Sequence, residues 1–353
     1  MTDEPLVLAA RDGDEAAFAE LVTRYRPELQ VHCYRMLGSV HEAEDLVQET
    51  FLRAWRRRES YRGPGRYRAW LYGIATHACL DALKRHRRRP SGDGPPPEAA
   101  HLAPAPAVAV PWLQPYPDDL LDAALARTAG TAEPADAAVV ARETVELAFL
   151  AAVQYLPPRQ RAVLLLRDVL GWPAAQVAAA LEISVAAVTS ALQRARPALR
   201  RRLPERRLDW PAPDAVSAAD RELVRRYADA VERSDGAALA ALLRADARAG
   251  HQPGAGGHAG DRAAWYQGRD VLVEAWAPVM AGADGPALRL LPVTANRRPA
   301  LASYMRPPGA EEYTAFALAV LTVVDGLIAE VQAFTPDVFP AFGLPPSRRA
   351  DEF

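Results

Sequence analysis

The chain has 353 residues, half of them hydrophobic, and a net charge of −2. This length exceeds what one hydrophobic core usually organises, so two or three domains are expected. No apolar run reaches about 18 residues, which excludes a membrane span, and two cysteines exclude a disulfide framework or a cysteine-based zinc site. The acidic N-terminal sequence predicts no secretory signal, so we expect a cytoplasmic protein without a metal site or a cofactor.

Charge is distributed unevenly along the chain. Residues 1–90 carry a net charge of +3 and residues 138–208 a net charge of +6, whereas residues 91–137 carry −6 and residues 209–353 carry −5. This pattern predicts two modules that face nucleic acid, an acidic linker between them and an acidic C-terminal domain. If the acidic parts fold back on the basic modules, we expect them to inhibit DNA binding.

The first 90 residues have a helical pattern. Apolar residues recur at steps of three and four between residues 15 and 37, which predicts an amphipathic helix, and Pro27 predicts a kink or a break within it. A second helix is expected from about Val40 and a third from about Tyr67 to Arg88.

The second of these helices has an acidic face. In the stretch HEAEDLVQETFLRAW, Leu46, Phe51 and Trp55 lie near one side, and burying such side chains stabilises a fold by about 1.5–3 kcal/mol each. Asp45, Gln48, Glu49 and Arg53 lie largely on the other side. The spacing alone favours a solvated face with acids near a helix N-terminus. Because an acidic face repels DNA, the alternative is a contact with a basic protein.

The segment Arg56–Pro90 interleaves arginines with aromatic residues, a combination that binds unstacked bases and phosphates. A plain apolar core is the competing interpretation, and it suits Trp70 and Leu71. From about Pro90 to Pro134 the sequence is rich in proline and glycine, which is typical of a linker. Pro111–Asp119 within it contains two aromatic residues and a leucine, so we expect this part of the linker to dock on another surface.

A helix–turn–helix pattern follows and ends near Leu203. Gly171–Trp172 predicts the turn, Pro173 the first position of the next helix and Ser184 the N-cap of the second helix. Three apolar residues of that second helix are expected to face inward: Val185, Val188 and Leu192. Six residues are expected to face a major groove: Ala187, Thr189, Ser190, Gln193, Arg194 and Arg196. A generic helical pair is the alternative.

After a short linker, residues 208–217, helices are followed by strand-like runs, which predicts an α+β domain. Asp325–Gly326 between apolar runs predicts a two-residue hairpin turn.

Together these segments resemble bacterial sigma factors of the extracytoplasmic-function (ECF) type, within the sigma-70 family. CYRMLGSVHEAEDLVQETFLRAW is similar to their second conserved region, and LPPRQRAVLLLRDVLGW with VAAALEISVAAVTSALQRAR is similar to their fourth. The resemblance implies a multidomain protein: an all-α region 2 bundle at residues 1–90, a linker at 91–136 and an all-α region 4 helix–turn–helix at 137–207. It implies a non-enzymatic initiation subunit that binds core RNA polymerase and promoter DNA.

The resemblance also implies roles for particular residues. Asp45, Gln48 and Glu49 would dock on the β′ coiled coil of core polymerase, and region 4 would meet the β flap. The second helix of the helix–turn–helix would read the −35 element through the six residues named above. The −10 element would be bound by Tyr61, Arg62, Arg66, Arg68, His77, Lys84 and Arg85.

The C-terminal part resembles the SnoaL-like, cone-shaped α+β fold that is fused to some sigma factors, here at residues 218–346. The residues that carry this resemblance are Trp265, Tyr266, Gly268, Asp325 and Gly326, together with DVFPAFGLP and the linker motif WLQPYP. The resemblance implies a regulatory domain that responds to a small ligand or a protein signal.

The chain departs from these patterns in four places. His77 stands where asparagine is frequent, Glu182 stands where glycine is frequent at a turn, and Pro197 lies late in the recognition helix and predicts a kink. Arg248–Asp261 is glycine-rich where an apolar strand is expected, which predicts an incomplete ligand cavity. His251, His258 and Asp261 within it have the residue types of an acid–base set, but a flexible loop argues against catalysis.

Two other functions fit parts of the sequence. An effector-responsive helix–turn–helix regulator would need neither the acidic helix nor the arginine–aromatic segment. A polyketide-cyclase-like enzyme with DNA-binding modules would need paired catalytic groups, and the C-terminal sequence offers none outside the glycine-rich segment.

Overall fold

The computed structural model describes residues 3–61, 67–85, 110–128, 146–203, 216–258, 263–280 and 285–353. Within the range 110–128, side chains are described up to residue 124. The chain divides into two compact units. The first comprises Met1–Pro95 and Asp119–Arg207, and the second comprises Pro96–Asp118 and Leu208–Phe353.

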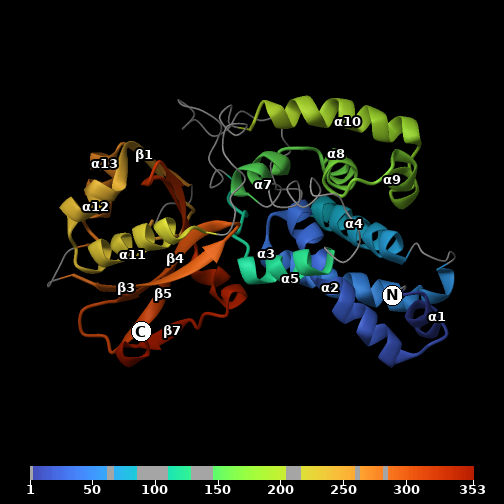
Figure 1. Cartoon of the computed structure of the whole chain (residues 1–353), viewed down its shortest axis with the longest axis horizontal. Coiled ribbons are helices and arrows are strands. Elements are labelled where there is room, and N and C mark those ends of the chain that lie inside the picture. The colour runs from blue at the N-terminus through green and yellow to red at the C-terminus, as the bar shows by residue number, and fades with distance from the viewer. Residues whose placement is uncertain are drawn as a thin grey trace. The chain divides into compact units, whose positions relative to one another are not determined.

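The N-terminal half of the first unit is a helical bundle (Figure 1). Its elements are α1 (Glu4–Arg11), α2 (Glu15–Leu37), α3 (Val40–Arg56), the 3-10 helix η1 (Arg58–Ser60) and α4 (Tyr67–Arg85). Asp14 caps α2 by accepting from the backbone N–H of Ala16 at 2.9 Å, and Ser39 caps α3 by accepting from Glu42 N–H at 3.2 Å. Helix α2 continues through Pro27, so the predicted break does not occur.

The packing of α2 explains why Pro27 does not end the helix. Leu21 and Leu29, on either side of the proline, are completely buried against the rest of the bundle. Burial of these large side chains offsets the loss of one backbone hydrogen bond.

The second half of the first unit holds the helix–turn–helix. Its elements are α5 (Asp118–Thr128), α7 (Leu147–Gln154), α8 (Pro158–Leu164), the π-helical η3 (Leu165–Val169), α9 (Ala174–Ala180) and α10 (Val185–Arg200). Helix α5 lies within the predicted linker, so part of that segment is helical. Pro173 is the N-cap residue of α9 and not its first residue, and α10 runs through Pro197.

The recognition helix begins as predicted, with one error in its buried face. Ser184 Oγ accepts from Ala187 N–H at 3.1 Å, which confirms the N-cap. Glu182 has a φ of 54°, the left-handed conformation expected at a position where glycine is frequent. Val188 and Leu192 are buried, but Val185 is 49% exposed. Val185 is the first residue of α10, and burial of the helix begins one turn later, at Val188.

The second unit has three helices and a seven-stranded sheet. The helices are α11 (Ala218–Glu232), α12 (Gly236–Leu242) and α13 (Arg269–Trp276), with the 3-10 helices η6 (Pro336–Phe342) and η7 (Ala350–Glu352). The strands are β1 (Leu243–His251), β2 (Ala264–Gln267), β3 (Ala287–Ala295), β4 (Arg298–Arg306), β5 (Glu312–Val324), β6 (Leu327–Phe334) and β7 (Ser347–Arg349). The α+β prediction is therefore confirmed.

The sheet has the order β2-β1-β6-β5-β4-β3, and β7 pairs with β5. Strands β1 and β6 are parallel, and the other pairs are antiparallel. Asp325 and Gly326 have φ values of 52° and 73° and join β5 to β6, which confirms the predicted hairpin. Figure 1 shows α11, α12 and α13 beside the sheet, and their apolar residues share one core with it.

The prediction that the segment from Arg248 lacks a strand is wrong. Strand β1 continues to His251 and pairs with β2 on one edge and with β6 on the other. Backbone hydrogen bonds on both edges compensate for the weak strand preference of its small residues, among which Ala247 and Ala249 are buried.

No single helix in the described part of the chain is long and apolar enough to cross a membrane. Helices α9 and α10 reach that length and composition only when taken together, and a bend of 103° separates them.

Candidate polymerase and promoter interfaces

The acidic face of α3 is exposed above a buried apolar side. Asp45 and Gln48 are exposed and Glu49 is partly buried, whereas Leu46 and Phe51 are buried. Phe18 of α2 packs on this apolar side, with ring centroids 6.3 Å from Phe51 and 4.9 Å from Trp55. The face is therefore carried by a helix whose orientation the core determines.

Two side chains modify this face in ways that the helical pattern did not indicate. Glu49 accepts from Arg53 Nε at 2.7 Å, and Arg53 also reaches Asp81 at 3.4 Å, so part of the negative charge of Glu49 is neutralised. Leu52 is 52% exposed and lies one helical turn from Gln48. Leu52 adds one apolar side chain to this otherwise polar face. Its position four residues after Gln48 was the signal available in the sequence.

The residues predicted for the −10 element are in different environments. Tyr61 is buried in an aromatic cluster, 5.5 Å from the ring centroids of both Tyr67 and Trp70. Lys84 and Arg85 are exposed at the end of α4, with Lys84 Nζ 3.6 Å from Asp81. Arg62 and Arg66 lie outside the described residues.

Arg68 has an internal partner. It donates to Glu28 of α2 at 2.8 Å, and its guanidinium lies 5.3 Å from the centre of the Tyr72 ring. Burial raises the pKa of Glu28, and the nearby Arg68 charge opposes that increase. In this arrangement Arg68 connects α4 to α2, and 35% of its side chain remains exposed. His77 is partly buried, with Nδ1 2.9 Å from the carbonyl oxygen of Gly73.

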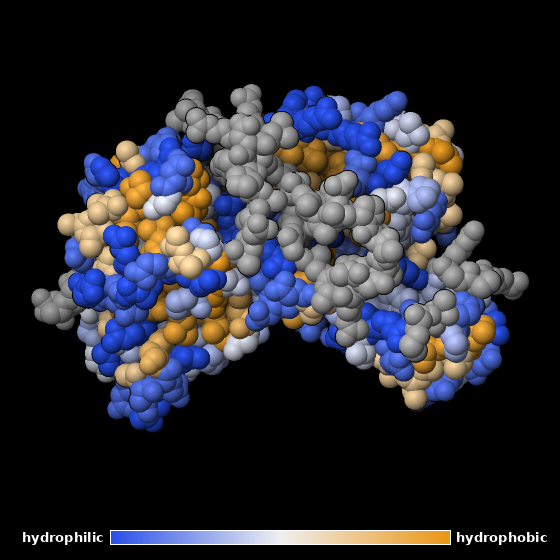
Figure 2. Space-filling view, in the orientation of Figure 1, coloured by the Kyte–Doolittle hydropathy of each residue, from blue (hydrophilic) through white to orange (hydrophobic). Residues whose placement is uncertain are grey.

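Most residues predicted to face a major groove are exposed on α10. Ala187, Thr189, Gln193, Arg194 and Arg196 are exposed and Ser190 is partly buried. Figure 2 shows a largely polar surface on the outward side of this helix. Arg194 donates to Ser190 Oγ at 2.7 Å. Arg196 makes two hydrogen bonds with Asp168, at 2.9 and 2.8 Å, so it would have to exchange this partner for DNA.

Buried hydrogen bonds join the two helical modules within the first unit. Buried Arg161 of α8 donates to the carbonyl oxygen of Met36 and to both Oε1 and the carbonyl oxygen of Gln154, the latter two at 2.6 Å. Gln154 Nε2 donates to the Arg35 carbonyl oxygen at 3.3 Å. The carbonyls of Arg35 and Met36 belong to the last turn of α2, where a helix lacks internal donors and is electronegative. A buried cation is well suited to this position.

A second contact between the modules lies on α4. A Cβ atom on Gly73 would be 3.4 Å from the carbonyl oxygen of Ala180 in α9, and Tyr72 packs on Trp172 with ring centroids 5.4 Å apart. A cleft of about 1120 Å³ beside this contact is lined by His77 and by residues of α9. The helix predicted to read the −10 element therefore faces the helix–turn–helix.

The predicted docking of the linker is confirmed, and its partner is the C-terminal domain. Tyr116 N–H donates to Asn296 Oδ1 at 2.8 Å, and Asn296 N–H donates to the Tyr116 carbonyl at 3.0 Å. Arg297 N–H donates to Asp118 at 2.8 Å, and Gln252 Nε2 donates to the Leu113 carbonyl at 2.6 Å. Leu113 and Tyr116 are completely buried. The linker is thus held as an extension of this domain.

Three motif residues of the C-terminal domain, Trp265, Tyr266 and Gly268, lie where β2 ends and α13 begins. Gly268 has a φ of 96° and is the N-cap residue of α13, two residues after Tyr266 of β2. Tyr266 contacts His251, with ring centroids 5.8 Å apart.

The acid–base set considered from the sequence is not assembled in the described residues. His251 is buried at the end of β1, where Trp276 Nε1 donates to its Nε2 at 3.3 Å and its Nδ1 lies 3.4 Å from the Ala255 carbonyl oxygen. Burial lowers the pKa of His251. Asp261 lies outside the described residues. A small cavity, lined in part by His251, is present in this domain.

Comparisons with known proteins define the class of this chain. Residues 21–89 match Sigma-70 region 2, residues 146–199 match Sigma-70, region 4, and residues 224–331 match the SnoaL-like domain. This is the composition of a sigma-70-type initiation factor with a SnoaL-like C-terminal domain.

Individual relatives identify the family. The chain is 41% identical to the ECF RNA polymerase sigma factor SigG of Mycobacterium tuberculosis, over 97% of this chain and 89% of that protein. It is 30% identical to SigW of Bacillus subtilis, over 55% of this chain and 92% of that protein. The chain belongs to the ECF RNA polymerase sigma factors, a family that is in general not enzymatic. This finding supports a sigma factor and not an effector-responsive regulator that uses its helix–turn–helix alone.

A solved structure has the same fold. The crystal structure of the ECF sigma factor SigJ of Mycobacterium tuberculosis aligns with a TM-score of 0.54 at 24% identity, covering 93% of this chain and 99% of that one. The architecture predicted from the sequence, two all-α sigma modules and an α+β SnoaL-like domain, is therefore confirmed.

Proposed function

We propose that this sigma factor docks on core RNA polymerase through α3, reads the −10 element with α4 and reads the −35 element with α10. The observation that carries this proposal is the exposed face of Asp45, Gln48 and Leu52 on a helix whose opposite side is buried. The face combines negative charge with one apolar residue, so it fits a basic protein partner better than DNA. The proposed partner is the β′ coiled coil, with the β flap meeting region 4.

The proposed module boundaries are residues 1–90, 137–207 and 218–346, with linkers at 91–136 and 208–217. Strand β7 lies just beyond the last boundary and pairs with β5, which supports extending the C-terminal domain to the end of the sheet. A subunit of RNA polymerase works where the chromosome lies, so we propose a cytoplasmic location.

The contact between α4 and α9 has a consequence for promoter binding. Elements at positions −10 and −35 lie about 25 base pairs apart, roughly 85 Å at 3.4 Å per base pair. Helix α9, which directly precedes α10 in the helix–turn–helix, lies against α4 at Gly73, so the two modules in this arrangement do not span that distance. The described arrangement is therefore a closed state, and the modules must separate to engage a promoter.

We assign a regulatory and non-catalytic role to the C-terminal domain. Its hydrogen bonds to the segment Val110–Asp118 support this role, because that segment belongs to the chain that joins the two DNA-reading modules. A domain that holds this connection limits how far the modules can move apart. The acidic charge of the linker and the domain would add repulsion against DNA.

The polymerase-docking proposal is tested by charge reversal. Asp45→Lys should weaken binding to core polymerase about ten- to hundredfold, because it places like charges in contact across the interface. Run-off transcription with purified core polymerase should fall in parallel. The matched control is Asp12→Lys, which reverses another exposed acid of the first unit.

Two outcomes would contradict the docking proposal. One is unchanged core affinity for Asp45→Lys, and the other is an equal loss for Asp12→Lys. Circular dichroism melting curves of both variants should match the unaltered protein, since both side chains are exposed.

A further inference from the structure

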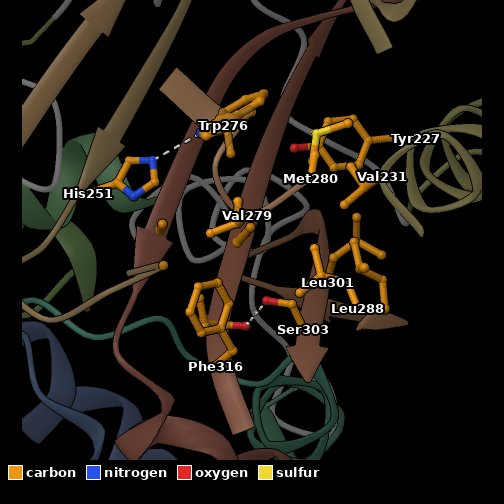
Figure 3. Close-up of a pocket in the computed structure, with 16 residues that line it drawn as sticks. Tyr227, Val231, His251, Trp276, Val279, Met280, Leu288, Leu301, Ser303 and Phe316 are labelled. Carbon is orange, nitrogen blue, oxygen red and sulfur yellow. Dashed lines mark hydrogen bonds between the residues drawn. The ribbon is translucent and has the colours of Figure 1, made fainter. Parts of the chain in front are cut away.

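The C-terminal domain encloses a cavity of about 90 Å³ that the proposed promoter and polymerase contacts do not use. It lies between α11, the end of α13 and the strands β3 to β6 (Figure 3). Most of its lining is apolar, including Val231, Leu288, Leu301 and Phe316. An apolar cavity of this kind lacks the polar partners that hold ordered water.

The lining carries no charge. Its side chains with polar atoms are those of Tyr227, His251, Trp276 and Ser303, and no Lys, Arg, Asp or Glu is among the lining residues. Since a buried ion without a counter-charge is strongly unfavourable, the cavity excludes charged ligands. Any occupant must be neutral and mostly apolar.

Three of the polar side chains use their hydrogen-bonding groups on one another or on the backbone. Trp276 donates to His251 Nε2 at 3.3 Å, and His251 Nδ1 lies against the Ala255 carbonyl. Ser303 Oγ donates to the Ala317 carbonyl at 2.8 Å. These contacts fix the polar end of the cavity without requiring a ligand.

Tyr227 is different. The residue is 94% buried (6% exposed) and lines the cavity, and its hydroxyl makes none of the hydrogen bonds found among the described side chains. Figure 3 shows this hydroxyl directed from the ring toward the side of the cavity where Trp276 lies. Burial raises the pKa of Tyr227, so the group is a neutral O–H. A hydroxyl that faces a largely apolar cavity gains free energy when a group in that cavity bonds to it.

We propose that this cavity binds a small, neutral, mostly apolar molecule with one hydroxyl or carbonyl oxygen, which hydrogen-bonds to the hydroxyl of Tyr227. The cavity is smaller than the roughly 150 Å³ engineered cavity that holds benzene. The part of the ligand that is buried is therefore about the size of one six-membered ring or smaller.

The position of the cavity connects it to the linker. His251 and Ala333 line the cavity, and the residue after His251, Gln252, donates its backbone N–H to Ala333 and its side chain to the linker carbonyl of Leu113. A ligand in the cavity contacts the strand ends that hold the linker. If the proposed regulatory role is correct, this is where the ligand acts, but ligand binding itself does not depend on that role.

The test uses phenol and benzene, which share a ring and differ by one hydroxyl. The full chain has four methionines, and Met280 lines the cavity, so ¹³C-methyl methionine NMR gives a local signal with internal controls. Phenol should shift the Met280 methyl signal saturably and leave the signals of Met36 and Met305 in place. Tyr227→Phe should weaken phenol binding about five- to tenfold and change benzene binding less than twofold.

Two control variants distinguish the effect of the Tyr227 hydroxyl from the effect of the cavity volume. Tyr313→Phe alters a tyrosine of the same domain that does not line the cavity, and it should leave both affinities unchanged. Ala317→Leu fills the cavity and should abolish both shifts. The proposal is overturned if Met280 responds to neither probe, or if phenol binds the Tyr227→Phe variant as well as the unaltered chain. Because the measurement is binding, failure of the polymerase-docking test would not affect its result.

Discussion

The protonation state of His32, a buried side chain of region 2, is determined by its packing. Its Nε2 lies 2.9 Å from Thr76 Oγ, and its ring centroid is 4.9 Å from that of Tyr72. Burial lowers the pKa of His32 to about 3, with the charges of Arg35 and Arg68 adding to the effect. The folded protein therefore holds this imidazole neutral at all physiological pH values.

This imidazole should make region 2 sensitive to acid. The pKa of His32 is lower in the folded chain than the 6.5 of the unfolded chain, so its contribution is complete above pH 6.5 and is lost as pH falls toward 3. We expect a loss of about 2 kcal/mol in the free energy of unfolding between pH 6.5 and 5. Denaturant titrations at several pH values measure it.

The variant His32→Gln isolates this contribution. It should be less stable at pH 7 and lose less stability on acidification than the unaltered chain. The raised pKa of Glu28 acts in the opposite direction in both proteins and cancels in the comparison. Identical pH slopes for the two proteins would show that His32 is not responsible.

At the scale of elements, the proposed closed state depends on a close approach between two helices. Gly73 of α4 faces the backbone of α9 at Ala180, and a larger side chain would need space that this contact does not provide. Hydrogen bonds from Arg161 and Gln154 to the end of α2 hold the same modules nearby. The closed state thus combines a steric fit with a buried polar contact.

Gly73→Leu should open the two modules. Its side chain would push α9 from α4, so small-angle X-ray scattering should show a larger radius of gyration and a protease should cut the linker faster. Gly73→Ala is the control, because its methyl group would lie at ordinary contact distance from Ala180 and should stabilise α4 by about 0.5–1 kcal/mol. Equal radii for the Leu and Ala variants would argue against a closed state that depends on this contact.

At the scale of the whole molecule, the segment Val110–Asp118 links the sigma modules with the C-terminal domain. It lies between α4 and α7 in the chain, yet its hydrogen bonds go to residues about 180 positions away in sequence. Asn296 is the central residue of this contact and has a φ of 54°. One turn of the C-terminal domain therefore holds the described part of the connection between the two sigma modules.

Asn296→Ala should release the linker. The variant removes the acceptor for the buried N–H of Tyr116, a loss of about 1–3 kcal/mol, and puts alanine at a φ that disfavours it. Limited proteolysis near Tyr116 should become faster, and run-off transcription should rise several-fold as the modules separate more easily. Asn296→Asp keeps an acceptor oxygen and should stay closer to the unaltered protein. Unchanged cleavage in the alanine variant would refute the role of this turn.

Much of the fold was predictable because its signals are local. The caps Ser39 and Ser184 act within three residues, the apolar stripes of α2 and α10 repeat within one or two turns, and the Asp325–Gly326 turn needs only its own two residues. These features determined the two helical sigma modules, the recognition helix and the α+β character of the C-terminal domain. The acidic face of α3 was predictable for the same reason.

Only the tertiary structure decided how these parts use their side chains. Arg68 pairs with Glu28 across 40 residues and Arg196 pairs with Asp168 across 28, so arginines that the sequence offers to DNA are partly engaged within the protein. The docking site of the linker, the contact of Gly73 with Ala180 and the cavity around Tyr227 also join distant segments. Helical period and capping are set by neighbours along the chain, whereas ion pairs and cavities depend on packing between segments that no local pattern encodes.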